Sequence, residues 1–510
     1  MKRPSGLPTS SACKGMCMKK KIGLFLKTVI FLCLLGICLF GCSLIVQRKS
    51  SYIKNEMYMQ EAEKNNIDVF ILGSSHVING INPIQLYEDT GITAYNLGGY
   101  GSVLLSSYWQ YRLALAYNTP KLVIVDAYML ENDIRYIDDP NANVNSEELH
   151  LNIDRFPLSR TKLAAMDDMF EHQEKKYPFL FDFMVYHDRW KELDSNDFKR
   201  VTGTAEINHL MGADLNYEVL SSGLAYTDYG AGTLENETVG TTYLRRIIED
   251  CRSRGIDVVV VTVPFLAMYE NQAAAHTAAN IAAEYGVASI NMLEMPGIVD
   301  YDVDFMDAGH MNIMGATKVT DYLGKWLSEN KDLPDHRNEI GYENWQKFSE
   351  EFKADILNKS EENEDLYSQL VYLNLTAQDK TFAISIKGGS KIYADTALLK
   401  LLKGIGATEQ LDLAAEGKQP YFMIYDHGTV SDVCGIGEIN DFDTSQGHMQ
   451  YEPASDLYRV LFIGDDTENN VLYSDAHPYV DLQLLFFDDG DISSHQYYTL
   501  NYLDYEYAQE

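Results

Sequence analysis

Cysteine is scarce outside the amino-terminal segment of this 510-residue chain. Five of the seven cysteines lie within the first 42 residues, and only Cys251 and Cys434 follow them. Two distant cysteines cannot build a disulfide framework, and they lack the spacing of a zinc site. The fold of the main body must therefore depend on its hydrophobic core.

Positive charge is also scarce after residue 50. The chain carries 41 Lys and Arg against 75 Asp and Glu, a net charge of −34. Nine of the basic residues and none of the acidic ones fall within residues 1–50, which leaves the remainder with a net charge of −43. So acidic a surface repels phosphate backbones, and we therefore expect no nucleic-acid partner. The hydrophobic fraction of 46% excludes a largely disordered chain.

Charged residues are absent from Thr28 through Val46, a run of 19 residues that is long enough to span a bilayer as a helix. Six of the nine basic residues precede Lys27, so residues 1–27 are predicted to be a cytoplasmic leader and residues 28–46 a single transmembrane anchor. The alternative is a signal peptide, because Leu39 to Cys42 resembles a lipoprotein cleavage box with lipidation at Cys42. Both interpretations place the body outside the cell membrane and tethered to it.

Short, fully apolar runs alternate with helical patterns between residues 67 and 328. Apolar runs without polar alternation suit parallel strands that are covered on both faces. With helices between them, they predict an α/β fold, a three-layer α/β/α sandwich around a parallel, five-stranded, flavodoxin-like sheet. Residues 130–235, approximately, break the pattern and are interpreted as a long insertion over one end of the sheet. The five strands are expected at residues 69–72, 94–97, 122–125, 258–263 and 288–290.

Three further segments flank this region. Residues 47–66 are predicted to form a polar, helical stalk, and residues 329–379 linker helices. Residues 380–510 are strand-rich and are expected to form an α+β domain that binds a partner or a glycan. Two Asp/Gly clusters there, at residues 464–466 and 488–491, could ligate calcium, but both fit hairpin turns better because neither belongs to a complete twelve-residue calcium loop.

Two segments far apart in the sequence carry the residue types of a hydroxyl nucleophile and its base. Ser75 follows the first strand, at the sheet edge where ligands bind in open α/β folds. A serine hydroxyl needs a neighbouring base, and His310 can take its proton while Asp307 orients the imidazole. The backbone amides of Ser75 and of Gly98 or Gly99 could hold an oxyanion, because glycine allows close approach of the backbone.

Each of these signals also has a purely structural interpretation. Gly-Ser-Ser after a strand is often only a tight turn, and an isolated Asp-x-x-His is weaker still. Their combination at strand ends favours catalysis. His76 is expected to face the far side of the sheet or to pack under the loop. An aromatic and basic cluster at His187, Arg189 and Trp190 could line a sugar site, with a packed helix-end cluster as the alternative.

Together the segments resemble the SGNH, or GDSL-like, hydrolase superfamily over residues 66–328, approximately. Gly73-Ser74-Ser75 corresponds to its first block, Asn96 to Gly99 to its second, and Asp307 to His310 to its last. Two positions depart from the family. Ser74 stands where the family has Asp, and the third block, Gly-x-Asn-Asp, is missing, with Glu131-Asn132-Asp133 as a loose echo.

The resemblance implies a serine esterase or acyltransferase with Ser75, His310 and Asp307 as catalytic residues and with no cofactor or metal. A Gly-Ser-Ser variant behind an amino-terminal anchor is most similar to the SGNH proteins of D-alanyl transfer and exopolysaccharide acylation. This similarity implies a cell-surface glycan or teichoic-acid-like polymer as the substrate and a polytopic membrane O-acyltransferase as a partner. The alternatives are a non-catalytic scaffold of the same fold that binds such a partner or a wall polymer, and a hydrolase of lipid or peptide substrates.

Overall fold

The computed structural model describes most of the chain, in two compact units. One unit comprises Met1–Ile53 with Pro157–Ile207, and the other Lys54–Phe156 with Asn208–Glu510. The described residues are 10–46, 54–64, 66–137, 146–172, 176–180, 183–202, 209–220, 225–359, 363–453, 458–463, 471–475, 480–500 and 505–509.

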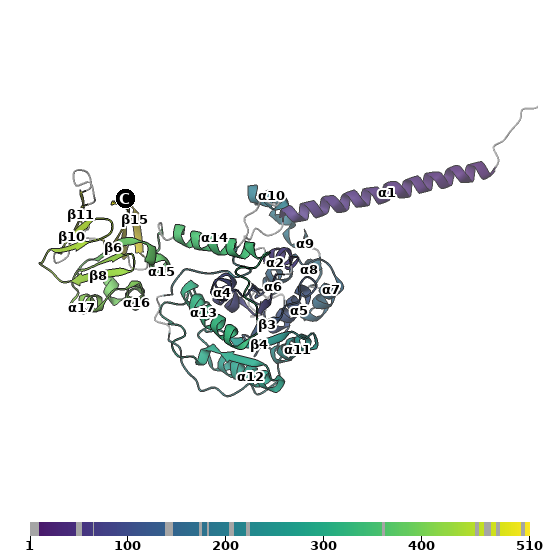
Figure 1. Ribbon diagram of the computed structural model, residues 1–510. Helices are drawn as coiled ribbons and strands as arrows, with labels where there is room; N and C mark the ends of the chain where they lie inside the picture. The colour runs from purple at the N-terminus through teal and green to yellow at the C-terminus, as the bar shows by residue number, and fades with distance from the viewer. Residues whose placement is uncertain are drawn as a thin grey trace, which may run out of the picture. The chain divides into compact units, whose positions relative to one another are not determined.

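A five-stranded parallel sheet, built from residues 69–291, is one of the three sheets that the described residues of the second unit form (Figure 1). Its order is β2-β1-β3-β4-β5, and every neighbouring pair is parallel. This is the order of flavodoxin-like sheets. The fully apolar runs predicted all five strands and their direction correctly. The strands are β1 (Val69–Leu72), β2 (Ala94–Asn96), β3 (Leu122–Asp126), β4 (Asp257–Thr262) and β5 (Ala288–Asn291).

Helices cover both faces of this sheet (Figure 1). On one face α13 (Ile313–Asn330) packs on α3 (Ser75–Gly80) and α4 (Pro83–Thr90), and their apolar side chains share a buried cluster with β1, β3 and β4. On the other face α11 (Val239–Ser253) packs between α5 (Leu104–Ala114) and α12 (Tyr269–Tyr285). The strands are thus buried on both sides, which is why their sequences show no polar alternation.

The predicted stalk contains a helix that is part of the folded unit. Helix α2 (Lys54–Ala62) buries Tyr58, whose hydroxyl donates to the carbonyl of Ala114 at 2.7 Å and whose ring meets those of Phe70 and Tyr95 edge-on. These contacts make α2, the helical part of the predicted stalk, a member of the folded unit. Residues 47–53 and 65 lie outside the described part of the chain.

The residues after α13 form helices and two antiparallel sheets within the same unit. Helices α14 (Glu343–Lys359) and α15 (Leu366–Thr376) lead to a six-stranded sheet of order β15-β14-β13-β6-β7-β8. One face of this sheet packs on α15, α16 (Thr396–Ile405) and α17 (Glu409–Gly417), and the other packs on the four-stranded sheet β12-β11-β10-β9. The strands are β6 (Thr381–Ile386), β7 (Tyr421–Asp426), β8 (Thr429–Cys434), β9 (Asn440–Asp443), β10 (His448–Pro453), β11 (Tyr458–Ile463), β12 (Val471–Asp475), β13 (Leu482–Asp488), β14 (Asp491–Leu500) and β15 (Tyr505–Gln509).

The Asp/Gly cluster at residues 488–491 forms a hairpin turn, as its sequence favours. Asp488 pairs with Asp491, and Asp489 and Gly490 both have positive φ. The other cluster, at residues 464–466, lies outside the described residues.

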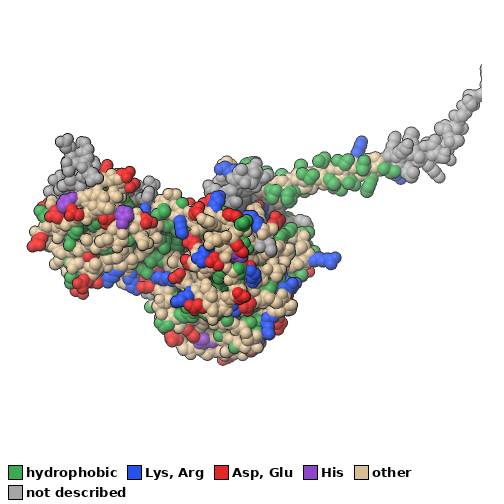
Figure 2. All heavy atoms as spheres, in the orientation of Figure 1, with side chains coloured by type: hydrophobic (Ala, Val, Ile, Leu, Met, Phe, Trp, Pro, Cys, Tyr) green, Lys and Arg blue, Asp and Glu red, His purple; other side chains and the backbone are tan. Residues whose placement is uncertain are grey.

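The first unit contains the long helix α1 (Ser10–Val46) and the helices of residues 157–207. Over Lys21–Val46, helix α1 is the one helix among the described residues that is long and apolar enough to cross a membrane. Figure 2 shows hydrophobic side chains along its surface, and most of them are exposed. Length and composition fit an anchor and a signal sequence equally. The other helices are α7 (Arg160–Met169), α8 (Tyr177–Leu180), α9 (Phe183–Tyr186), η2 (His187–Lys191) and α10 (Ser195–Thr202); α6 (Ser146–Ile153) belongs to the second unit.

Candidate active site

Ser75 lies just beyond the carboxyl end of β1, at the first residue of α3. The side chain of Ser74 caps this helix by accepting the amide of His76 at 3.1 Å. Gly73 is required at the turn, because a Cβ there would stand 2.8 Å from Cβ of Asp126 and 3.0 Å from Val77. The tight turn holds Ser75 at the sheet edge with 8% of its surface exposed.

A continuous hydrogen-bonded chain joins Ser75 to the distant Asp307 through His310. Nε2 of His310 lies 2.7 Å from Oγ of Ser75, and Nδ1 lies 2.9 and 2.8 Å from the two carboxylate oxygens of Asp307. A carboxylate only accepts hydrogen bonds, so Nδ1 carries the proton and Nε2 presents a lone pair to the serine hydroxyl. This is the arrangement that lets an imidazole act as the base for a serine nucleophile.

The turn before α13 keeps Asp307 in place and ionised. Its carboxylate also accepts the backbone amides of Gly309 at 2.7 Å and His310 at 2.8 Å. Burial raises the pKa of Asp307, but the hydrogen bonds from the His310 ring and from these amides outweigh it, and the pKa lies below its ordinary value. Asn312 then caps α13 by accepting the amides of Met314 and Gly315.

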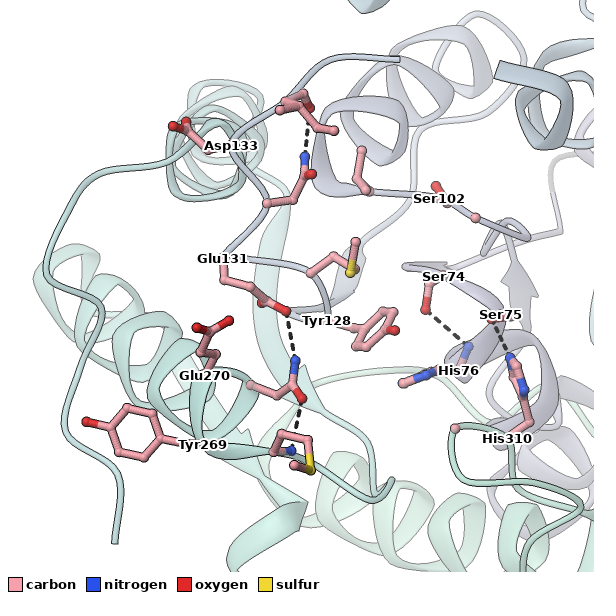
Figure 3. A pocket seen from close by; sticks show the side chains of 18 of the residues that line it. Ser74, Ser75, His76, Ser102, Tyr128, Glu131, Asp133, Tyr269, Glu270 and His310 are labelled. Carbon is pink, nitrogen blue, oxygen red and sulfur yellow. Dashed lines mark hydrogen bonds between the residues drawn. The ribbon is translucent and has the colours of Figure 1, made fainter. Parts of the chain in front are cut away.

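Ser75 and His310 border an open cleft of about 910 Å³ at the carboxyl edge of the sheet. Figure 3 shows the pair at one side of the cleft and the side chains of Glu131, Tyr269 and Glu270 across from it. The far walls come from the loop after β3 and from the start of α12. A cleft of this volume lies within the range of small-molecule binding sites.

The two glycines predicted to hold an oxyanion have their amides engaged elsewhere. The amide of Gly98 donates to Oδ1 of Asn96 at 3.0 Å, and that of Gly99 donates to the carbonyl of Gly73 at 3.0 Å. Neither glycine lines the cleft, whereas Gly101 does. The structure thus does not support Gly98 and Gly99 as donors, because their backbone is folded onto the nucleophile turn instead.

Gly98 and Gly99 have packing roles. A Cβ on Gly98 would lie 2.5 Å from Cγ2 of Val77, and one on Gly99 would lie 2.2 Å from Oδ1 of Asn152. Glycine is needed at position 98, because the backbone carbonyl of Ser74 also lies 2.8 Å from that Cβ, whereas a side chain at position 99 would displace only the end of the Asn152 side chain.

His76 lies in the wall of the cleft and not on the far side of the sheet, the first of the two placements expected for it. Its ring is buried against Tyr128, Phe265 and the edge of His310, at centroid distances of 3.7, 4.7 and 5.7 Å. Burial, followed by the charge of His310, lowers its pKa to about 3, although Asp307 opposes the shift. The His76 ring is therefore neutral and lies beside the hydrogen-bonded residues Ser75, His310 and Asp307.

His187, Arg189 and Trp190 do not line the cleft. They belong to η2 in the first unit, where Arg189 donates to the carbonyl of Val46 at 2.9 Å and to Asp197 at 3.2 Å. Asp197 is fully buried, so Arg189 neutralises an interior carboxylate, whereas Trp190 is 63% exposed.

Several cleft residues were missed by sequence reasoning, notably Tyr128, Tyr229, Tyr269 and Glu270. The loose echo at 131–133 was a usable signal, since Glu131, Asn132 and Asp133 all line the cleft. Within the described part of the chain, no group of three or more His, Cys, Asp or Glu side chains is placed to hold a metal ion.

Comparison with known proteins adds no family to this geometry: no protein-family model matches the chain, and no curated protein sequence matches it.

Proposed function

We propose that the chain is a membrane-tethered serine esterase or O-acyltransferase of the SGNH type, acting on acyl groups of a cell-surface glycan. The observation that carries this proposal is the pair of hydrogen bonds that links Ser75, His310 and Asp307 at the edge of an open cleft, with lengths of 2.7 and 2.8 Å. Two segments separated by 235 positions meet there, with Nε2 of His310 within hydrogen-bond reach of the Ser75 hydroxyl, which supports a serine nucleophile.

In the proposed reaction Oγ of Ser75 attacks the acyl carbon while Nε2 of His310 takes the hydroxyl proton. Asp307 stabilises the imidazolium, which then returns the proton to the departing alcohol and leaves an acyl ester on Ser75. Water or a sugar hydroxyl, deprotonated by His310, attacks this ester and restores the serine. The backbone amide of Ser75 is the remaining predicted donor to the oxyanion, now that Gly98 and Gly99 are committed elsewhere.

Labelling with a fluorophosphonate tests the nucleophile directly, because the reagent modifies only an activated serine. We expect the full chain in detergent to be labelled at Ser75 and the Ser75→Ala variant to stay unlabelled. Ser102→Ala is the matched control, since Ser102 also lines the cleft but bonds Ser106 at 2.7 Å rather than a histidine. An unlabelled wild-type chain would contradict the proposal.

A non-catalytic scaffold of the same fold is the second candidate, and the engaged amides of Gly98 and Gly99 favour it. A site with few oxyanion donors loses much of the transition-state stabilisation that an esterase requires. The two candidates predict different cellular results. If Ser75→Ala leaves the acyl content of surface polymers unchanged while deletion of the protein alters it, the scaffold is correct.

A further inference from the structure

The cleft beside Ser75 extends away from the nucleophile to a wall of acidic side chains. Glu131 and Asp133 come from the loop after β3, and Glu270 from the first turn of α12 (Figure 3). No Lys or Arg is among the described residues that line the cleft. Its other ionisable residues are Asp307, His310, His76 and the tyrosines, and His76 is neutral because burial lowers its pKa to about 3. The cleft is therefore strongly negative.

One oxygen of the Glu131 carboxylate lacks a hydrogen-bond donor among the described residues. Oε1 of Glu131 accepts from Asn271 at 2.8 Å, whereas Oε2 is buried and has no partner among the described residues. Burial raises the pKa of Glu131 above its ordinary value, although its own backbone amide and the Asn271 side chain oppose the shift, and the charge of Glu270 adds to it. A buried acceptor without a donor is costly, so this oxygen gains from a ligand that offers a hydroxyl or an amine. His76 adds a second buried atom without a partner in the described structure, its Nδ1, which donates or accepts according to the tautomer of this neutral ring.

Exposed aromatic rings form the outer rim of the same wall. Tyr269 is 54% exposed and Tyr229 42%, and Met268 beside them is 61% exposed. Large apolar side chains left open at the mouth of a polar cavity mark a binding surface. Flat rings beside hydrogen-bond acceptors match a sugar, which offers an apolar ring face and hydroxyl donors along its edge.

We propose that the cleft takes a sugar without negative charge, stacked on the tyrosine rim with its hydroxyl or amino groups donating to the carboxylates. This inference rests on the proposed function and narrows its substrate class. It favours neutral sugars and amino sugars over phosphate-bearing polymers, because a phosphate placed among Glu131, Asp133 and Glu270 would be repelled without a compensating cation.

The test compares the acetyl esters of glucose, glucosamine and glucose 6-phosphate, which share the sugar ring and carry no charge, a positive charge and a negative charge, by acetate release from the full chain in detergent. We expect kcat/KM for the phosphorylated ester to be at least about tenfold lower than for the other two, the size of effect that close carboxylates produce in a partly shielded site. Equal or faster turnover of the phosphorylated ester would overturn the proposal.

Charge-neutralising variants identify the residues responsible. Asp133→Asn with Glu270→Gln alters two exposed side chains, so folding is spared, and it should reduce the discrimination against phosphate by several-fold. Glu416→Gln with Glu438→Gln removes the same charge from exposed positions outside the cleft and should leave the ratio unchanged. Tyr269→Ala should raise KM for the neutral ester while Tyr269→Phe keeps it, because stacking needs only the ring. Equal ratios in both double variants would contradict the assignment.

A binding measurement separates this inference from the proposed function. Calorimetric titration of the Ser75→Ala chain with free glucose, glucosamine and glucose 6-phosphate measures their affinities without turnover. We expect glucose 6-phosphate to bind most weakly. If Ser75 is labelled by the fluorophosphonate but the three sugars bind equally well, the proposed substrate class is wrong and the esterase proposal stands. A wild-type chain that is never labelled, but binds glucosamine or glucose better than glucose 6-phosphate, would overturn the esterase and support the binding site.

Discussion

Replacing Asp307 by Asn tests the proposed proton transfer from Ser75 to His310 with little disturbance of the fold. The Asn oxygen can still accept the amides of Gly309 and His310, so the turn before α13 survives. Its NH₂ group then occupies the place of Oδ2, 2.8 Å from Nδ1 of His310. Two N–H groups repel each other, which favours the tautomer with its proton on Nε2 against the remaining contact of Nδ1 with the Asn oxygen at 2.9 Å. In that tautomer, Nε2 can no longer take the proton of Ser75.

The expected consequence is a fall in kcat of about 10⁴-fold, or about 5.5 kcal/mol, which is the size measured when a triad carboxylate is replaced in this way. The rate of fluorophosphonate labelling and the hydrolysis of p-nitrophenyl acetate measure it in the detergent-solubilised chain. Asp302→Asn is the matched control, because it lies on the same loop and pairs with Lys400 at 2.6 Å instead of His310.

One result would refute the reasoning. If Asp307→Asn retains activity within about threefold of the wild-type protein, the carboxylate does not set the tautomer of His310. The hydrogen bonds among Ser75, His310 and Asp307 then stabilise the fold and do not serve catalysis.

Three further predictions follow from the same contacts. Burial raises the pKa of Asp126 from 3.8 to about 7, so the native protein keeps a proton that the unfolded chain has released, and the free energy of unfolding falls as pH rises from about 4 to about 7. Asp126→Asn removes this loss and should raise stability relative to the wild type by up to about 4 kcal/mol at pH 8 but little at pH 4, as followed by thermal unfolding; an equal shift at both pH values would contradict it. Gly98→Ala should destabilise the fold by about 2 kcal/mol, because the new Cβ would stand 2.5 Å from Val77, and an unchanged melting temperature would show that the turn can relax. His187→Ala and Trp190→Ala should leave the labelling rate of Ser75 unchanged, since both residues lie outside the cleft, and slower labelling would restore them as site residues.

The parallel sheet could be predicted because its signal is local. Each strand is a short run of apolar residues that must be buried on both faces, and this requirement is visible in the run itself. The nucleophile and the base could be found for a related reason. Ser75 and His310 follow or precede recognisable elements, and parallel strands bring their carboxyl ends to one edge.

The hydrogen-bonding state of the backbone could not be predicted in the same way. The sequence Gly98-Gly99 suggested a donor pair, but whether an amide faces a cleft or a neighbouring carbonyl depends on the path of the chain over residues far away. The stalk illustrates the same limit. The polar composition of residues 54–62 concealed one buried tyrosine, Tyr58, whose partners Phe70, Tyr95 and Ala114 are supplied by three other segments.

Sequence alone thus determined the alternation of strands and helices, the apolar amino-terminal helix and the residues able to act as nucleophile and base, because these depend on the composition of single segments. Tertiary structure alone decided that Ser75 and His310 stand 2.7 Å apart, that the glycine amides are engaged, and that an acidic, tyrosine-rimmed cleft adjoins the serine. The walls of that cleft come from loops without periodicity, and only the packing of the elements that carry such loops brings their side chains together.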